Sequence, residues 1–335
     1  MKKILITLLV LAAVALVLAA VYRHQYSSVI SAEDRVSVRL PIPAADTGFA
    51  PLYLGADAGF FGRAKLRVTL EPGSPELNPV KMVAQGTDQF GLIGGPELLF
   101  SARAKHLPVV GVALLGRNAN LAGIITLKSS GITTLEQLEG KTLGFYYGHI
   151  TTDILHILLR KQNVHVTERD VGFDYSPLIT NQVAGEWGFL TTGGITLPAK
   201  GVSINFINAA DYGVITQGYV IIANENFVKE HPEIVQRFVD ATIAATKHTL
   251  DHPDEAIDAA IKRDSQFRRD IGEKQVPLYA AAIRNNPQIG SFPQQDIETT
   301  ITQMRSADLL PADFNQAGAF DSRFVDAYYR NAAAK

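Results

Sequence analysis

Residues 36–70 read VSVRLPIPAADTGFAPLYLGADAGFFGRAKLRVTL. The segment opens with a short apolar run typical of a strand, Val36–Leu40, and closes with a second such run, Leu66–Leu70. Between them lies a run with helical character, Leu52–Gly59. A strand, a helix and a second strand in succession are typical of α/β proteins with a largely parallel sheet. We therefore expect an α/β fold.

The same alternation continues along the chain. Further strands are expected at Phe90–Ile93, Val109–Leu115, Thr142–Phe145 and Tyr219–Ala223, and near Ile124, Val171, Phe189 and Ile204. Helices are expected at Val80–Ala84, Glu97–Ala104, Asp153–Lys161 and Leu178–Val183, with a capping box at Thr133–Glu136 and a helix start at Pro232. The chain after Ala223 is mostly helical in pattern, and we expect it to add bulk and no chemistry.

The N-terminus carries the pattern of an export signal. Lys2 and Lys3 precede the run Ile4–Val21, which is apolar except for Thr7. We expect residues 1–21 to be a signal peptide or an N-terminal membrane anchor, because the run is long for a cleaved signal and just long enough to span a bilayer. The expected location is the periplasm, with membrane contact through this segment if it is not cleaved.

The composition narrows the function. No cysteine occurs among the 335 residues, so disulfides, thiolate nucleophiles and a lipid-attachment cysteine are excluded. The net charge of −2, with both signs interspersed, argues against nucleic acid as a partner. His248 and His252 are four residues apart, but we identify no acidic third ligand beside them. We therefore expect no metal and no cofactor, and we find no hydrolase motif.

The length predicts two domains. About 300 residues follow the N-terminal segment, and this exceeds what one hydrophobic core usually serves. No long linker or internal repeat interrupts the α/β pattern, so the domains must be joined by short crossings. Gly123–Thr126 and Gln217–Tyr219 are the candidates.

Several segments resemble a known family when their order and spacing are taken together. They include Phe49–Gly55, Ala58–Phe61, Leu66–Val68, Gly94–Leu99, Leu107–Val110, Ser130–Ile132, Leu138–Thr142 and Ala210–Gly213. In these segments the chain resembles the periplasmic binding proteins for thiamine pyrimidine precursors, sulfonates and nitrate. The likeness covers nearly all of the chain after the N-terminal segment, and Asp211-Tyr212-Gly213 looks most like the pyrimidine-precursor branch.

This resemblance implies a type II periplasmic-binding-protein fold, with two α/β lobes joined by two crossings and a ligand cleft between them. Lobe one would hold 35–123 plus 219–335, and lobe two would hold 124–218. The implied function is the solute-binding component of an ABC importer for a small heteroaromatic solute, with the permease and its ATPase as partners. We expect a monomer. The alternatives are a sulfonate, taurine or nitrate-type anion as ligand, or a membrane-anchored ligand sensor.

An enzyme is a third class of function. The same fold includes pyrimidine-precursor synthases that need a cysteine-rich motif to support iron chemistry. Because this chain has no cysteine, we expect no enzymatic activity.

In lobe one, three loops that follow strands offer candidate ligand contacts. Asp46, Thr47 and Phe49 offer a carboxylate, a hydroxyl and an aromatic face, although Asp46 or Thr47 could simply cap a helix. Gly95 and Pro96 open a helix whose free amides suit a polar or anionic group, or they form an ordinary tight turn. Asn118 offers an amide to a heterocycle.

In lobe two, the best candidates are Tyr147, His149 and Thr151, between a strand and a strong helix. Tyr147 offers a stacking face, His149 a hydrogen bond, and Thr151 a helix cap. The alternative is that one tyrosine belongs to the core and Thr151 only caps. Asp174 offers a carboxylate to an amine, or an N-cap before Pro177. Trp187 is either a stacking wall or core.

Overall fold

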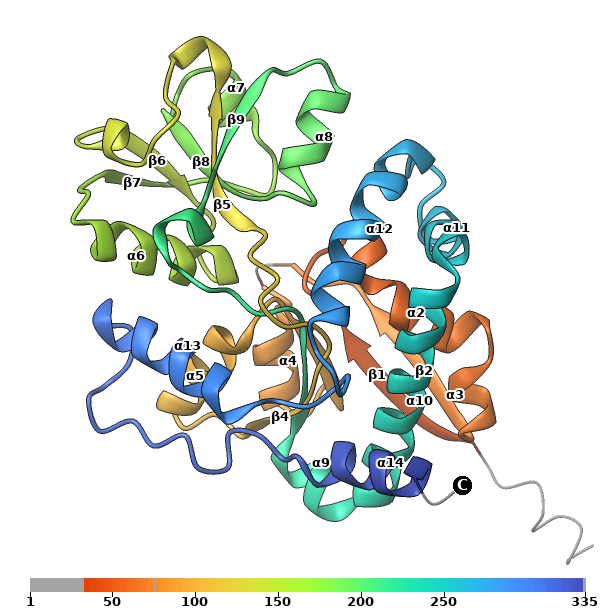
Figure 1. Cartoon of the computed structure of the whole chain (residues 1–335). Helices are drawn as coiled ribbons and strands as arrows, with labels where there is room; N and C mark the ends of the chain where they lie inside the picture. The colour runs from red at the N-terminus through yellow and green to blue at the C-terminus, as the bar shows by residue number, and fades with distance from the viewer. Residues whose placement is uncertain (1–32, 75, 334–335) are drawn as a thin grey trace, which may run out of the picture. The chain divides into compact units, whose positions relative to one another are not determined.

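The computed structural model describes residues 33–74 and 76–333 (Figure 1). The predicted export segment, residues 1–21, lies outside the described residues. Whether it is a signal peptide or an anchor stays a prediction. Within the described part of the chain, every helix is too short or too polar to cross a membrane. The chain from Arg35 onward forms one compact unit.

The strands form two five-stranded sheets. The first has the order β2-β1-β3-β10-β4 and the second the order β7-β6-β8-β5-β9. The strands of the first sheet are β1 (Asp34–Arg39), β2 (Leu66–Glu71), β3 (Phe90–Ile93), β4 (Val109–Leu114) and β10 (Val220–Asn224). Those of the second are β5 (Ala122–Leu127), β6 (Thr142–Phe145), β7 (Thr167–Asp170), β8 (Gly185–Phe189) and β9 (Ile204–Asn208). The chain thus passes between the sheets twice, after β4 and after β9.

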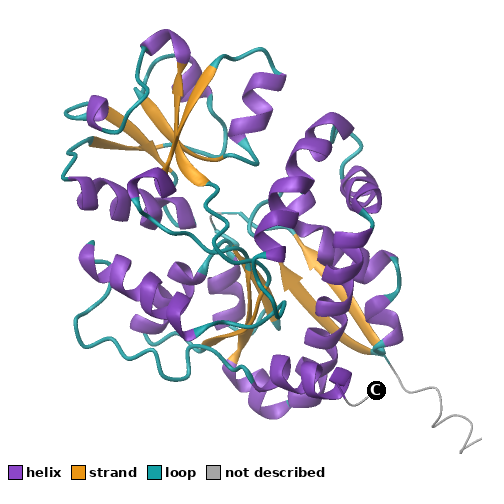
Figure 2. Ribbon diagram, viewed as in Figure 1, coloured by secondary structure: helices purple, strands orange, loops and turns teal. Residues whose placement is uncertain are grey.

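Helices flank both sheets (Figure 2). Those up to β10 are α2 (Ala50–Asp57), α3 (Phe60–Arg63), α4 (Pro79–Ala84), α5 (Pro96–Ala104), α6 (Ile150–Gln162), α7 (Ser176–Ile179) and α8 (Gly193–Ala199). The others are α9 (Glu225–Glu230), α10 (Pro232–Asp251), α11 (Pro253–Arg263), α12 (Arg269–Arg284), α13 (Gln294–Ser306) and α14 (Arg323–Ala333). Short 3-10 turns are η1 (Thr47–Phe49), η2 (Lys128–Ser130), η3 (Glu136–Leu138) and η4 (Ala209–Tyr212).

The expectation of a largely parallel sheet holds in part, because each sheet also contains a strand that is antiparallel to its neighbours. β1 runs parallel to β3, and β6 runs parallel to β7 and β8. β10 is antiparallel to β3 and β4, and β5 is antiparallel to β8 and β9. β5 and β10 are the strands that the chain enters directly from the other sheet. They need no helical crossover within their own sheet, which a parallel neighbour would require.

The sequence of β10 is apolar from Val220 to Ala223 because both faces of this strand are covered. Ile221 belongs to the core between the first sheet and α2 and α10, whereas Ile222 belongs to a core on the opposite face with α4 and α5. Successive side chains of a strand point to opposite faces, so the side chains of a central strand that is covered on both sides all face apolar surroundings.

Helix α10 packs on the first sheet through one apolar face, and its start at Pro232 is as predicted. Ile234, Phe238, Ala241 and Ala245 are all buried, and Pro232 begins the helix. The Phe238 ring stacks on Phe90 with ring centroids 3.9 Å apart. Burial of such large side chains, each stabilising by roughly 1.5–3 kcal/mol, holds the helix against the sheet.

One local prediction is wrong. The capping box at Thr133–Glu136 is absent, because the side chain of Gln137 accepts the backbone N–H groups of Thr133 and Thr134, and only the turn η3 follows. The strand expected near Val171 is the exposed strand β7, which ends one residue before it and whose sequence TERD has no apolar residue. A polar edge strand gives no hydrophobic signal to find it by.

Helix α13, the helix before α14, packs on α5 and on α6. Its apolar residues Ile297, Ile301 and Met304 join the same core as Leu143 and Ile154 of the second sheet's layer. Lobe two, predicted at 124–218, therefore shares its core with the C-terminal part of the chain. The lobe limits themselves stay a prediction.

Candidate functional site

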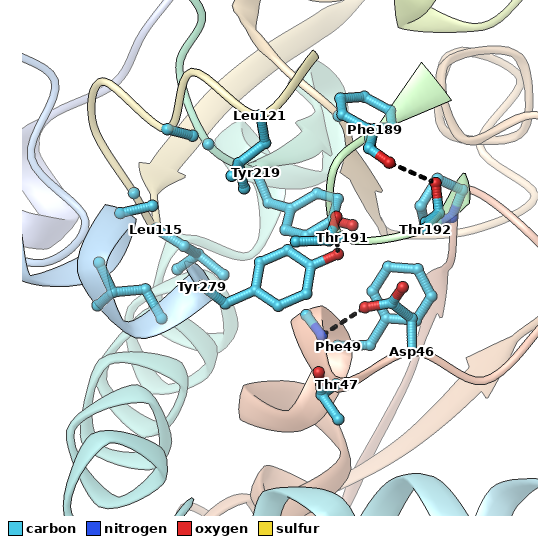
Figure 3. A pocket seen from close by; sticks show the side chains of 18 of the residues that line it. Asp46, Thr47, Phe49, Leu115, Leu121, Phe189, Thr191, Thr192, Tyr219 and Tyr279 are labelled. Carbon is cyan, nitrogen blue, oxygen red and sulfur yellow. Dashed lines mark hydrogen bonds between the residues drawn. The ribbon is translucent and has the colours of Figure 1, made fainter. Parts of the chain in front are cut away.

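Loops from the two sheets meet around a cavity of about 80 Å³. This is several times the roughly 10–15 Å³ that one water molecule needs. Strand-end loops and α12 line it from the first sheet's side, and loops around β8 line it from the second sheet's side (Figure 3). Both crossings contribute, through Gly116 and Leu121 on one and Thr216 and Gln217 on the other.

Aromatic rings form much of the cavity wall. From the first sheet's side come Phe49, Tyr219 and Tyr279, with ring centroids 5.6 Å apart for Phe49 and Tyr219 and 6.0 Å apart for the two tyrosines. From the second come Trp187 and Phe189. Such rings offer flat apolar faces on which a planar ligand can stack.

Asp46 supplies a carboxyl group to this aromatic cavity. It is the N-cap of η1, and its Oδ1 accepts the backbone N–H of Gly48 at 2.6 Å. The residue is only 3% exposed, and burial raises the pKa of Asp46 to about 6. No lysine or arginine belongs to the described residues that line the cavity. The carboxyl therefore lacks a cation that would neutralise it.

Gly48 brings the Asp46 loop close to the two tyrosines. A Cβ atom at this position would lie 2.6 Å from Tyr279 and 2.8 Å from Tyr219. These separations are shorter than any van der Waals contact, so a larger residue would push the rings aside. The absence of a side chain at Gly48 lets the carboxyl and the rings share one wall.

α12 links this loop to the second sheet. Gln275 Nε2 donates a hydrogen bond to the carbonyl oxygen of Thr191 at 2.8 Å, and Gln275 Oε1 accepts one from the Thr47 hydroxyl at 3.0 Å. The Tyr279 hydroxyl donates to Thr191 Oγ1 at 3.1 Å. Thr191 follows β8, so these bonds bridge the two sides of the cavity. The expectation that the helical tail adds no chemistry is therefore wrong.

His149 lies on the other side of the cavity as the N-cap of α6. Its Nδ1 lies 3.1 Å from the hydroxyl oxygen of Thr151. Burial lowers the pKa of His149 to about 4, so the imidazole is neutral at pH 7. Thr151, expected to cap the helix, is instead a partner of the capping histidine and does not line the cavity.

Trp187 is buried at the centre of a ring cluster. Tyr146 stacks on it at 5.4 Å between centroids, and His149 lies at the same distance. Its indole Nε1 has no hydrogen-bond partner among the described residues. Trp187 lines the cavity, and the described part of the chain leaves this buried N–H without a partner.

Six predicted contacts lie outside the cavity lining: Gly95, Pro96, Asn118, Tyr147, Thr151 and Asp174. Tyr147 is 44% exposed and its hydroxyl donates to Glu168. Asp174 is exposed and accepts the backbone N–H of Ser176 at 2.8 Å, but the N-cap of α7 is Tyr175, not Asp174 or Ser176 as the capping alternative predicts. The backbone N–H of Asn118 donates to Gln217 at 3.0 Å. Contact of these side chains with a ligand stays a prediction without support from this geometry.

The start of α5 shows why Gly95 and Pro96 miss the cavity. Gly94 lines it instead, and Pro96 occupies the first turn of the helix. The carboxyl of Glu97 folds back over this turn, since a Cβ at Gly95 would lie 2.6 Å from Glu97 Oε2. Burial raises the pKa of Glu97 to about 7. The helix start is thus occupied by an acid of its own chain.

Sequence reasoning missed Tyr219, Tyr279, Gln275 and Thr191. Tyr219 lies at the end of the predicted crossing Gln217–Tyr219, and crossings between lobes are a reasonable place to look for ligand contacts. Gln275 and Tyr279 carry no such signal, because they sit within an ordinary amphipathic helix. Gln275 lies 229 residues from Asp46 in the chain.

A model of the family described as NMT1/THI5 like matches residues 46–256. The chain belongs to the NMT1/THI5-like family. Among the relatives of this NMT1/THI5-like chain are the formylaminopyrimidine-binding protein of Halalkalibacterium halodurans and the riboflavin-binding protein RibY of Chloroflexus aurantiacus. Both are 24% identical to it. The first alignment covers 81% of this chain and 85% of the relative, and the second covers 83% and 82%.

Solved structures confirm the predicted fold of this NMT1/THI5-like protein. The alkanesulfonate-binding protein SsuA of Xanthomonas axonopodis pv. citri, bound to MOPS, superposes with a TM-score of 0.69 at 16% identity. The superposition covers 86% of this chain and 98% of that structure. Other relatives in sequence are named 4-amino-5-hydroxymethyl-2-methylpyrimidine phosphate synthase, so the family holds both binding proteins and enzymes.

Proposed function

We propose that this protein is an extracytoplasmic solute-binding component of an ABC importer, and that its solute is a small planar heteroaromatic molecule bearing an amine. One observation carries the proposal: the buried carboxyl of Asp46 lies in an aromatic cavity without a neighbouring cation. An amino group or ring N–H of the solute would donate to Asp46, while its ring stacks on the aromatic wall.

The second side of the cavity supports the same class of solute. The unpartnered Nε1–H of Trp187, a cavity-lining residue, would donate to a ring nitrogen or carbonyl oxygen of the solute. Neutral His149 offers a further hydrogen bond without adding charge. A donor on one side and a carboxyl on the other would orient an asymmetric heterocycle, such as an aminopyrimidine, between them.

An anion such as a sulfonate, taurine or nitrate is a poorer match. The described lining holds no lysine or arginine, and the neutral His149 supplies no positive charge. Arg117 is paired with Asp296, its Nη2 lying 2.9 Å from Oδ1. Placing an anion beside the Asp46 carboxyl would add a like-charge repulsion in a region of low dielectric.

Two relatives support this assignment by their names, since formylaminopyrimidine and riboflavin are both heteroaromatic. We further propose that the protein binds its solute without converting it, although some relatives are synthases. The chain has no cysteine, and the described residues that line the cavity include no serine or lysine that could serve as a nucleophile.

Calorimetric titration of the purified protein tests the solute. We expect aminopyrimidines, such as formylaminopyrimidine and 4-amino-5-hydroxymethyl-2-methylpyrimidine, to bind, and taurine, an alkanesulfonate and nitrate not to bind. Asp174→Asn is a matched control for Asp46→Asn, because both aspartates cap a turn but Asp174 is exposed. The proposed solute would be refuted if only the anions bind, or if both variants lose aminopyrimidine affinity equally.

Export and delivery are tested in cells. We propose a periplasmic monomer whose bound, closed form engages the permease, and the bridges from α12 to Thr191 suit a closed cleft. Mass spectrometry of the native protein's N-terminus distinguishes cleavage within residues 1–21 from retention as an anchor. Co-purification with a sensor kinase instead of permease subunits would favour the sensor alternative.

A further inference from the structure

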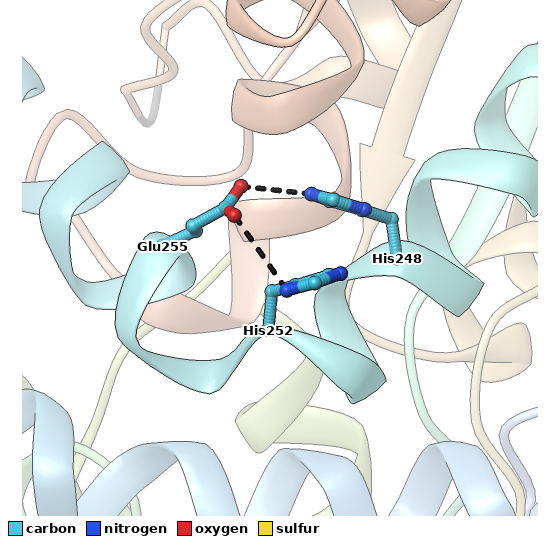
Figure 4. A group of neighbouring side chains, drawn as sticks. All are labelled: His248, His252 and Glu255. Carbon is cyan, nitrogen blue, oxygen red and sulfur yellow. Dashed lines mark hydrogen bonds and ion pairs between the residues drawn. The ribbon is translucent and has the colours of Figure 1, made fainter.

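The joint between α10 and α11 gathers three side chains of the kind that bind metals. His248 lies in the last turn of α10, His252 between the two helices, and Glu255 in the first turn of α11 (Figure 4). One potential ligand atom from each lies within 4.8 Å of the other two. The expectation that no acidic residue accompanies the two histidines is therefore wrong, because Glu255 comes from the following helix.

The distances approach those of a tetrahedral site. His248 Nε2 lies 2.8 Å from Glu255 Oε2, and His252 Nδ1 lies 3.6 Å from Glu255 Oε1. Donor atoms bound to zinc at its usual bond lengths lie roughly 3.3–3.4 Å from one another. These two separations, one to each carboxylate oxygen, lie on either side of this value, and the candidate donor atoms of the three residues lie within 4.8 Å of one another. Side-chain rotations would bring the donor atoms around one ion.

The two imidazole rings are held close together. Their centroids are 4.0 Å apart, and Phe60 packs against His248 at 5.3 Å. His252 N donates to the His248 carbonyl oxygen at 2.9 Å, which fixes the two residues one helical turn apart. This restraint lowers the entropy that a metal must overcome to bring its ligands together.

A second imidazole distinguishes this group from other histidine–glutamate pairs of the chain. His165 with Glu139 and His156 with Glu168 each offer one histidine and one carboxylate. Two imidazoles and a carboxylate suit a late first-row divalent cation, whereas Mg²⁺ and Ca²⁺ take oxygen ligands. The side chains of His248, His252 and Glu255 are 25%, 49% and 48% exposed, so an ion can reach them.

We propose that His248, His252 and Glu255 form a binding site for Zn²⁺ or a similar late first-row divalent cation. Three protein ligands leave a fourth position for water. The site lies apart from the solute cavity lining, yet Thr249, Leu250 and Ala256 of the same two helices do line that cavity. A bound ion would therefore hold the end of α10 against the start of α11, and these two helices carry part of the cavity wall. This effect would not depend on which solute binds.

Equilibrium dialysis of the full chain, made without a histidine tag and stripped with a chelator, tests the site with Zn²⁺. We expect one equivalent to bind and to raise the Tm. His252→Ala and Glu255→Gln should each weaken binding at least about tenfold, the former being the more exposed histidine and the less disruptive change. Co²⁺ should show the visible absorption of a tetrahedral ion in the unaltered protein and lose it in either variant.

His165→Ala is the matched control, because it removes an exposed histidine paired with one glutamate. It should leave Zn²⁺ binding unchanged. An unaltered protein that binds no stoichiometric Zn²⁺ overturns the proposal. So does equal weakening in His165→Ala and His252→Ala, which would mean diffuse binding to surface histidines. Circular dichroism of each metal-free variant checks that it is folded.

Discussion

Replacing Asp46 with asparagine should weaken solute binding and stabilise the empty protein. Asparagine keeps a side-chain oxygen for the Gly48 N–H and caps a helix about as well as aspartate. It removes the charge, which the cavity does not neutralise. The variant therefore separates the use of Asp46 in binding from its role as a cap.

The size of both effects follows from the buried carboxyl. A pKa raised from its ordinary value of 3.8 to about 6 corresponds to about 3 kcal/mol of unfavourable free energy for the charged form. Since asparagine relieves that cost but loses the stronger charged hydrogen bond, we expect a net gain of about 1–2 kcal/mol above pH 7. Loss of a charge-assisted hydrogen bond to the solute should weaken its affinity roughly 10–100-fold.

The pH dependence has a definite sign. The folded protein holds the Asp46 proton up to about pH 6, while the unfolded chain releases it near 3.8, so stability falls as the pH rises between these values. Urea unfolding at pH 4 and pH 7.5 measures this. The asparagine variant should match the unaltered protein at pH 4 and exceed it at pH 7.5. A variant that is less stable at both values, or that binds aminopyrimidine unchanged, would refute the reasoning.

Three further predictions concern the walls of the cavity and the strand beside it. Burial raises the pKa of Glu186 to about 8, so the protein should lose stability as the pH rises from about 4.5 to 8, and Glu186→Gln should reduce this loss. Urea unfolding midpoints at pH 5 and pH 8.5 test this, and an equal fall of the midpoint in both proteins contradicts it. Tyr279→Phe removes the hydrogen bond to Thr191, so calorimetry should show about fivefold weaker solute binding, and no change would mean that the bridge does not contribute to closure. Gly48→Ala should displace Tyr279 and weaken solute binding at least about tenfold in calorimetry. The control Gly62→Ala should leave the affinity unchanged, because a Cβ there would have no described atom within 4 Å apart from those of the adjacent residues and the helix backbone. Equal affinities in the two variants would contradict this.

Much of the architecture could be predicted from local pattern. Strands β3 and β6 occur at the predicted residues, and the resemblance to the family predicted the two-lobed fold. Asp46, Thr47, Phe49, His149 and Trp187 were predicted as ligand contacts and do line the cavity, although their contact with a solute stays a prediction. These successes share a cause, since apolar periodicity and strand-end position are properties of short segments.

Residue type and spacing alone predict the α/β alternation, the apolar face of α10 and the lack of cysteine chemistry. His248, His252 and Glu255 are also close in the chain, and the break between α10 and α11 brings them together. By contrast, Gln275 and Tyr279 come to lie beside Asp46 and Thr191 only through the tertiary structure. The contacts in the cavity join residues more than 80 positions apart. Packing of helices and sheets, which no local pattern encodes, sets which of them meet.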